Sequence, residues 1–316
     1  MSTVDDIRQL ARDLLREGKV ALVIGYERGT LPMRSRPAFV RTEAEADRLM
    51  WDPWCEADLV RYLHDRKEKT AVVAKACDVR AIVAAIKEKQ IKRDNVVIIA
   101  VRCGGILDRR RAEQIVKGRR LTAAVIEGET LVLNGDGFEE RVLCSAVLRE
   151  ECLYCADPAP VEADHVVGPE VKPRAAEDEY ADVAAFEKKS PEERWRWFYR
   201  EIEKCIRCYA CRSACPMCYC SECFADSSDP EWIGRGDDLV DKQFFHIVRA
   251  FHTAGRCVDC GACERACPMG IKLRMLTRKI QKDVKELFGG EAGKDMDSPP
   301  ALAAFDPKKD KDDFTG

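Results

Sequence analysis

The feature that most constrains this chain is a cysteine pattern that occurs twice. Four cysteines follow the spacing C-x2-C-x2-C-x3-C, with a proline directly after the fourth. The first run consists of Cys205, Cys208, Cys211 and Cys215, and the second of Cys257, Cys260, Cys263 and Cys267. Three thiolates at this spacing on a tight loop can each bind one iron of a cubane cluster. The doubled run therefore predicts two 4Fe–4S clusters.

The fourth iron of each cluster needs a ligand from elsewhere in the chain. In two-cluster ferredoxins the fourth cysteine of each run binds the other cluster. We therefore assign cluster 1 to Cys205, Cys208, Cys211 and Cys267, and cluster 2 to Cys257, Cys260, Cys263 and Cys215. A zinc-binding interaction module is the alternative, but zinc sites use paired C-x2-C units rather than four cysteines in one run.

Seventeen cysteines are present, so nine lie outside these two runs. Some of them are themselves closely spaced, which predicts a third cluster with ligands from a larger set. The candidates are Cys144, Cys152, Cys155, Cys218, Cys220 and Cys223. The alternative is that these thiols are buried as small hydrophobic side chains.

Charge and hydropathy exclude several classes of function. The chain has 53 basic and 56 acidic residues and a net charge of −3, which argues against a strongly basic nucleic-acid-binding protein. No apolar run approaches the roughly 20 residues of a membrane span. The first residues include two acids and no apolar signal core, so we expect a cytoplasmic, reducing environment in which disulfides are rare.

Residues 190–288, which contain both runs, are predicted to be mainly α-helical. Ser190, Pro191 and Glu193 form the sequence pattern of a capping box at a helix start. Residues 238–255 are predicted to form a helix between the runs, and we expect its aromatic residues to be core. The four histidines form no metal-binding pattern and are expected to be structural or exposed. They are His64, His165, His246 and His252.

Residues 1–155 are predicted to form an α/β domain, because strand and helix patterns alternate along them. Cys77, Asp78 and Arg80 follow one predicted strand, and Cys103 and Gly104 follow the next. Sheets of this class bind ligands at the carboxyl ends of their strands. These residues are candidates for a flavin site, for FAD or FMN, or for cluster binding. The alternatives are buried thiols and, for Asp78, a helix N-cap, which is the interpretation we favour for that residue.

Two further segments differ in composition from these domains. Residues 156–189 are rich in acidic residues and proline, which predicts a linker. Residues 289–316 consist largely of Gly, Pro, Lys and Asp, which predicts a disordered tail.

The two domains resemble known families. Residues 190–288 resemble the α-helical ferredoxin domain of heterodisulfide-reductase-like iron–sulfur subunits. Residues 15–170 resemble a domain of the beta subunits of deazaflavin-dependent hydrogenases and formate dehydrogenases, on the strings around Cys77 and Cys103 and the pair Cys152-Leu-Tyr-Cys155. Ala76 and Gly104 stand where that family has proline and histidine. The second resemblance implies a flavin that exchanges electrons with a deazaflavin and a cluster.

The sequence thus predicts an iron–sulfur electron-transfer subunit rather than an independent enzyme. It would relay single electrons through two or three clusters in an anaerobic oxidoreductase complex, with hydrogenase, formate dehydrogenase or heterodisulfide-reductase-like subunits as partners. A flavin-bearing catalytic beta subunit acting on NAD(P) or a deazaflavin is the alternative. The zinc-binding module is the second alternative.

Overall fold

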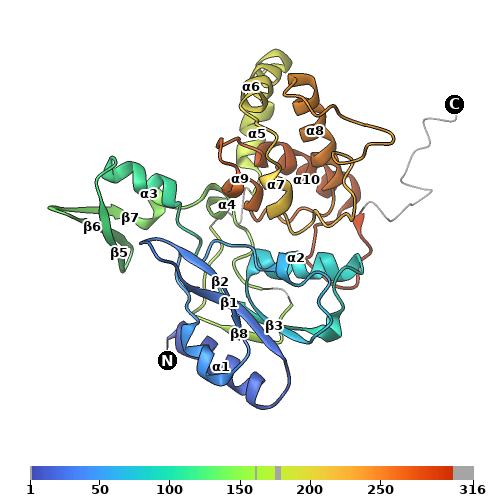
Figure 1. Ribbon diagram of the computed structural model, residues 1–316. Helices are drawn as coiled ribbons and strands as arrows, with labels where there is room; N and C mark the ends of the chain where they lie inside the picture. Colours follow the sequence, from blue (N-terminus) through green and yellow to red (C-terminus); the bar gives the residue numbers. More distant parts are fainter. Residues whose placement is uncertain (1, 161, 175–178, 302–316) are drawn as a thin grey trace. The chain divides into compact units, whose positions relative to one another are not determined.

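The computed structural model describes residues 2–160, 162–174 and 179–301, and these divide into two compact units. Unit 1 consists of Met1–Val79 and Ile91–Glu179. Unit 2 consists of Arg80–Gln90 and the chain from Tyr180 onward. The ribbon in Figure 1 shows strands mainly in the first part of the chain and helices in the last part. The predicted fold class, an α/β domain followed by a mainly helical domain, is confirmed.

A five-stranded sheet forms the centre of unit 1. Its order is β2-β1-β3-β4-β8, and only β2 runs antiparallel to its neighbour. The strands are β1 (Leu22–Arg28), β2 (Ser35–Val40), β3 (Thr70–Lys75), β4 (Val96–Val101) and β8 (His165–Val167). All residues of β3 and β4 are buried, as is usual for parallel strands covered on both faces.

The register of the two central strands aligns the loops that follow them. Lys75, the last residue of β3, pairs with Val101, the last residue of β4. Cys77 and Cys103 each come two residues after these positions, at the same edge of the sheet. The helices of this part of the chain are α1 (Thr3–Arg16), α2 (Ala76–Lys87), α3 (Arg109–Val116) and α4 (Glu150–Leu153). The 3-10 helices are Glu43–Arg48, Val60–Tyr62, Arg93–Asn95 and Cys144–Val147.

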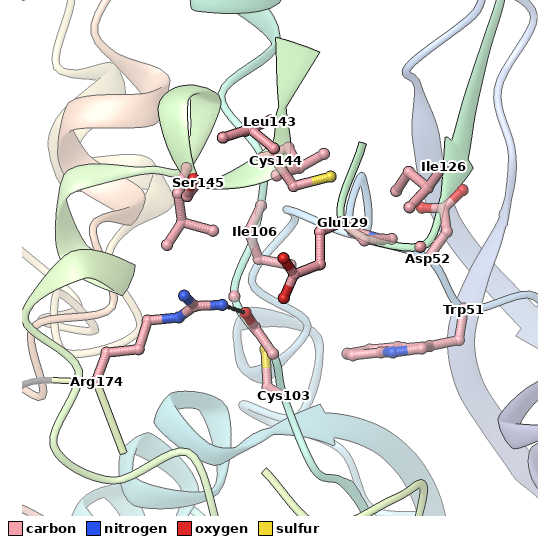
Figure 2. A pocket seen from close by; sticks show the side chains of 16 residues that line it. Trp51, Asp52, Cys103, Ile106, Ile126, Glu129, Leu143, Cys144, Ser145 and Arg174 are labelled. Carbon is pink, nitrogen blue, oxygen red and sulfur yellow. Dashed lines mark hydrogen bonds between the residues drawn. The ribbon is translucent and has the colours of Figure 1, made fainter. Parts of the chain in front are cut away.

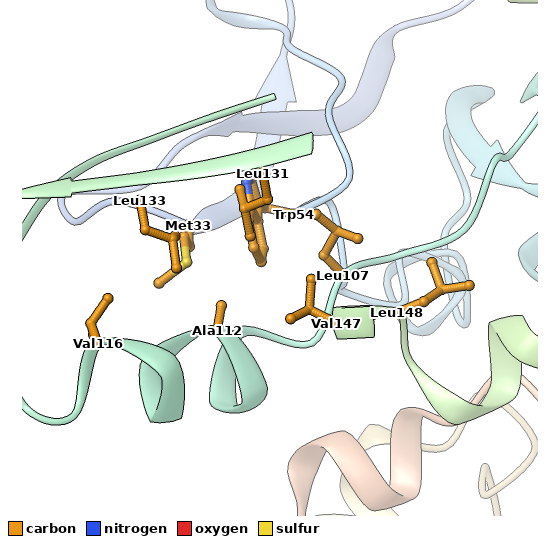
Figure 3. Packing of buried hydrophobic residues seen from close by; sticks show 9 residues of the cluster. All are labelled: Met33, Trp54, Leu107, Ala112, Val116, Leu131, Leu133, Val147 and Leu148. Atoms are coloured by element: carbon orange, nitrogen blue, oxygen red, sulfur yellow. The ribbon is translucent and has the colours of Figure 1, made fainter. Parts of the chain in front are cut away.

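A second, antiparallel sheet of unit 1 packs against α3. It consists of β5 (Leu121–Glu127), β6 (Thr130–Gly135) and β7 (Phe138–Leu143). Figure 3 shows the apolar side chains that fill the space between this sheet, α3 and neighbouring loops. The cluster contains Met33, Trp54, Leu107, Ala112, Val116, Leu131, Leu133, Val147 and Leu148.

Unit 2 is built from short and long helices around the two cysteine runs. They are α5 (Ala181–Glu187), α6 (Pro191–Glu203), α7 (Ala210–Ala214), α8 (Leu239–His252), α9 (Ala262–Ala266) and α10 (Arg274–Phe288). The capping box at the start of α6 is confirmed: the Ser190 hydroxyl accepts from Glu193 N, and the Glu193 carboxylate accepts from Ser190 N. None of the helices in the described ranges is long and apolar enough to cross a membrane.

Two predicted segments differ from the structure. Within residues 156–189, His165–Val167 form β8 and Ala181–Glu187 form α5. Strand β8 is held by pairing with β4 and by the Asp164 carboxylate, which accepts from Ile98 N at 2.7 Å. The segment 289–301, predicted to be part of a disordered tail, makes side-chain contacts: Asp295 O and Ser298 Oγ each accept a hydrogen bond from Lys87 Nζ of α2. Residues 302–316 lie outside the described residues.

Candidate iron–sulfur and cofactor sites

The two cysteine runs fold as matching loops. In each run the second residue after the first cysteine has left-handed backbone angles, at Arg207 (φ 52°) and Asp259 (φ 55°). The residue before the short helix is also left-handed, at Tyr209 (φ 56°) and Gly261 (φ 70°). Non-glycine residues adopt this conformation rarely, and it is found where a site requires it. In the first loop it directs Arg207 N toward Cys205 Sγ at 3.3 Å.

The fourth cysteine of each run lies with the other run. Cys267 belongs to the buried cluster that contains Cys205 and Cys211. Its negative charge also raises the pKa of those two thiols, after the larger effect of burial. Cys215 acts in the same way on Cys257 and Cys263. This arrangement is the one that an exchange of fourth ligands between clusters 1 and 2 requires.

The cysteines of the runs range from buried to exposed. Cys205, Cys211 and Cys267 are buried, whereas Cys208 is exposed. Burial, followed by the negative charges of Asp259 and Cys215, raises the pKa of the Cys257 thiol to about 11. Iron binding must therefore displace protons from such thiols. No three His, Cys, Asp or Glu side chains of the described residues converge on a single metal ion. A cubane differs from such a site because each of its four thiolates binds a different iron.

Helix α8 brings polar side chains to these thiols. His246 Nε2 lies 3.3 Å from Cys205 Sγ, and Arg249 donates from Nη2 to Cys211 O at 3.2 Å. Burial, assisted by the charge of Arg249, lowers the pKa of His246 to about 4. Sequence reasoning missed this placement, since an isolated histidine in a helix carries no ligand-type spacing.

The loop of the second run is fixed by a buried ion-pair network. Asp259 accepts from Arg274 Nε at 2.8 Å and from Arg274 Nη2 at 2.7 Å, and it also pairs with Arg278. Arg278 makes two further bonds of 2.9 Å to Asp182. Burial alone would raise the pKa of Asp259, but the two arginines lower it. Helix α10 and residue 182 therefore hold the loop between Cys257 and Cys260.

Unit 1 gathers four other thiols from three segments. Cys77 lies in the first turn of α2, Cys103 in the loop after β4, and Cys152 and Cys155 lie in and just after α4. Besides burial and the charge of Asp78, the thiols of Cys103 and Cys155 raise the pKa of Cys77. Burial and the charge of Glu151 raise the pKa of Cys152, and Cys103 and Cys155 add to this effect. Because three separate segments contribute, spacing along the chain did not reveal this group.

The backbone around these four thiols is closely fitted. Ile106 N donates to Cys152 Sγ at 3.3 Å, and Cys103 N donates to Pro158 O at 3.2 Å. Gly105 has a φ of 104°, and a Cβ atom there would lie 2.7 Å from Leu148 Cδ1. The loop after β4 therefore requires glycine at position 105 and is held against α4.

The six cysteines predicted for a third cluster are divided between the two units. Cys144, Cys152 and Cys155 belong to unit 1, whereas Cys218, Cys220 and Cys223 belong to unit 2. Cys218 lies beside Cys215, whose hydrogen bond is the main cause that lowers the Cys218 pKa to about 7. Cys220 is exposed. The group that the structure brings together in unit 1 pairs Cys152 and Cys155 with Cys77 and Cys103.

A cavity of about 320 Å³ adjoins this group in unit 1. Figure 2 shows Trp51 and Arg174 on opposite sides of it, with Glu129 between them and Cys103 below. Arg174 Nη2 donates to Gly104 O at 2.9 Å. Its walls combine apolar side chains, such as Ile106 and Ile126, with polar ones in similar proportion. Its volume is in the range of cofactor sites. Gly104 and Cys144 also line it.

Asp78 and Arg80 have other roles than the cavity. Asp78 is completely buried and pairs with Lys75 Nζ at 2.7 Å. Its carboxylate also accepts from Lys75 N at 3.0 Å. Asp78 is the third residue of α2, and its side chain bonds to Lys75, the residue before the helix. The prediction that Asp78 is itself the N-cap is therefore wrong. Arg80 Nε donates to Ala292 O at 3.1 Å within unit 2.

Comparison with known proteins gives two domain matches. Residues 201–271 match the 4Fe–4S dicluster domain, and residues 67–183 match the C terminus of the coenzyme F420 hydrogenase/dehydrogenase beta subunit. The second match confirms the resemblance to the beta-subunit domain, and the first confirms a dicluster ferredoxin domain without a link to heterodisulfide reductases. A dicluster domain implies two 4Fe–4S clusters.

Two curated relatives match over nearly the whole chain. The F420-dependent formate dehydrogenase subunit beta of Methanocaldococcus jannaschii is 26% identical, covering 93% of this chain and 93% of the relative. The F420-dependent formate dehydrogenase 1 subunit beta of Methanococcus maripaludis is 27% identical, covering 95% and 93%. A chain of the F420-reducing NiFe hydrogenase complex of Methanosarcina barkeri aligns with a TM-score of 0.39 and 13% identity, covering 63% of this chain and 86% of that one. The chain is distantly homologous to the two formate dehydrogenase subunits.

Proposed function

We propose that this chain is the iron–sulfur, beta-type subunit of an oxidoreductase complex related to formate dehydrogenases and hydrogenases, in which it transfers single electrons. The observation that carries this proposal is the pair of matching cysteine loops whose fourth cysteines lie with the opposite run. The dicluster match over residues 201–271 and the two formate dehydrogenase relatives support it. The other subunits of such a complex are the proposed partners, and the proposed location is the cytoplasm.

The residues of unit 2 suit two bound 4Fe–4S clusters. Each cluster, when bound, accepts and releases one electron. The protein supplies the thiolates. Three of the four cysteines assigned to cluster 1 are buried, which would limit the contact of that cluster with water. The left-handed residues of each loop and the Asp259 network hold the ligands in place before iron is bound. A fixed frame reduces the rearrangement that accompanies a change of charge.

We further propose that Cys77, Cys103, Cys152 and Cys155 bind a third 4Fe–4S cluster. Four cysteines are the usual ligand set of such a cluster. Their thiols act on one another electrostatically, and buried thiols of this kind gain from binding a metal as thiolates. The close fit at Gly105 keeps Cys152 next to the loop that contains Cys103.

A flavin-bearing catalytic subunit is the second candidate function, and the cavity of unit 1 favours it. Trp51 offers an aromatic face, Arg174 a cation and Glu129 an acceptor to a planar, partly anionic cofactor. Cys103 lines the same cavity, so a flavin bound there would adjoin the proposed third cluster. The carrier that such a flavin would reduce or oxidise is a deazaflavin, as in the names of the relatives, or NAD(P).

Reduction of the purified chain by different donors tests the proposal. The full chain, purified without oxygen, is mixed with dithionite, reduced deazaflavin or NADPH, and the reduced clusters are counted by electron paramagnetic resonance. Reduction of the clusters by dithionite but by neither carrier supports the electron-transfer role. Reduction by reduced deazaflavin or NADPH as well, only when FAD or FMN is bound, supports the second candidate. A colourless protein that contains zinc and no sulfide would contradict both.

A further inference from the structure

Helix α8 turns a polar face toward the interior of unit 2. Lys242, His246 and Arg249 of α8 and its C-cap residue Thr253 follow one another at intervals of three or four residues and are all buried. A helix of a globular protein usually buries its apolar face instead. Burial of charged groups is costly unless they are paired. The groups that these buried polar side chains contact therefore indicate their role.

Arg249 is surrounded by thiols rather than carboxylates. Only 5% of the residue is exposed, and its electrostatic partners are Cys215, Cys263, Cys218 and Cys211. Within the described part of the chain, no Asp or Glu forms a salt bridge with it. Its Nε–H is buried and has no hydrogen-bond partner among the same residues. Since arginine remains protonated in proteins, a buried cation faces ligands of both cluster 1 and cluster 2.

His246 faces one cluster only. It is 3% exposed, and its Nε2 lies 3.3 Å from Sγ of Cys205, a ligand assigned to cluster 1. Lys242 differs from both residues, because its ammonium group pairs with Asp237 at 2.8 Å and donates to Glu203 O. The charge of Lys242 is therefore balanced by a carboxylate. Among the residues that the structure describes, the charge of Arg249 meets only thiols: cluster ligands and Cys218, which makes a side-chain hydrogen bond with it.

We propose that Arg249 and His246 set the reduction potentials of the two clusters. Arg249 acts as a counter-charge shared by clusters 1 and 2, and His246, protonated at Nε2, acts as a hydrogen-bond donor to the Cys205 thiolate of cluster 1. One electron makes an already negative cluster more negative by one charge. A nearby cation and a hydrogen bond to sulfur both favour that reduced form and raise the potential. This inference rests on the proposed function.

A redox titration of variants of the full chain tests it. Arg249→Gln, Arg249→Lys and His246→Phe are purified without oxygen, and each is titrated with dithionite as electron donor while cluster signals are followed by electron paramagnetic resonance. The matched control is Arg235→Gln, because the side chain of Arg235 is 81% exposed. Iron and sulfide equal to the unaltered chain must be shown first. Clusters missing from the unaltered chain itself would refute the proposed function rather than this inference.

Arg249→Gln should lower the reduction potentials of both clusters. At a fixed solution potential the ratio of oxidised to reduced cluster should rise at least tenfold, which corresponds to a shift of about 59 mV for one electron. Arg249→Lys should restore most of the shift, and His246→Phe should lower cluster 1 alone. Potentials unchanged in Arg249→Gln, or shifted equally in Arg235→Gln, would overturn the inference. If Arg249→Gln loses iron, His246→Phe decides: a potential of cluster 1 equal to that of the unaltered chain would overturn it.

Discussion

Replacing Arg278 by leucine should destabilise unit 2 by several kcal/mol. The Arg278 side chain is 2% exposed and pairs with Asp182 and Asp259, which are 17% and 14% exposed. Removing one partner of a buried ion pair costs about 3–5 kcal/mol, because the remaining charge stays buried without compensation. Asp259 keeps its pair with Arg274, so we expect the lower end, about 3 kcal/mol.

Urea unfolding measures this cost. With slopes of about 1–3 kcal/mol per molar urea, a loss of 3 kcal/mol lowers the midpoint by about 1 M or more. The transition is followed by the visible absorption of the clusters and by circular dichroism, which must coincide for a two-state treatment. Lys279→Leu on the same helix is the control. Its pairs with Glu187 and Asp283 are far more exposed than those of Arg278, and pairs near the surface are worth about 0–1 kcal/mol. Equal midpoints in the two variants would refute the reasoning.

Three further predictions concern unit 1. Trp54→Ala should lower the free energy of unfolding by about 3–5 kcal/mol, because it opens a cavity in the core of Figure 3. Calorimetry should then show a fall in the melting temperature on the order of 10 °C, and an unchanged melting temperature would contradict this. Cys103→Ser together with Cys152→Ser should remove about four of twelve irons per chain and leave the signals of the clusters of unit 2 unchanged; a full iron content would exclude these thiols as ligands. Gly105→Ala should produce a similar loss of iron, because its Cβ would approach both Leu148 and Cys152, and normal iron content would show that the loop can move.

The cysteine runs could be recognised from the sequence because ligand spacing is a local property. Each of the two runs contains its four cysteines within eleven residues, so they are close in space because they are close in sequence. The α/β fold was equally accessible, since β4 is a continuous apolar run and the centre of β3 is apolar. The sequence also placed Cys77 and Cys103 at the ends of successive strands, and the pairing of Lys75 with Val101 confirms this. In contrast, the approach of Cys152 and Cys155 to these two thiols is a long-range contact that spacing does not encode.

The hydrophobic pattern of α8 indicated the wrong buried face. Phe245 is buried as expected, but Phe244, Ile247 and Phe251 are at least 40% exposed. The interior side of this helix faces thiols, and polar residues such as Arg249 suit that environment better than apolar ones. A pattern analysis that assumes an apolar interior fails where a helix packs against a group of thiols.

The short strand β8 was missed for a similar reason. Its three residues carry no alternation long enough to detect, and they follow an acidic, proline-containing stretch. Pairing with β4 and the bond from Ile98 N to Asp164 make the strand, and both are long-range contacts.

The content of iron and acid-labile sulfide per chain tests the central claim most directly. It is measured together with zinc on the full protein, purified without oxygen. The account predicts about twelve irons and twelve sulfides, four of each for every cluster, with no stoichiometric zinc. About eight of each would confine iron to the two runs of unit 2 and remove the proposed third cluster. Zinc without sulfide would contradict the claim that this chain transfers electrons.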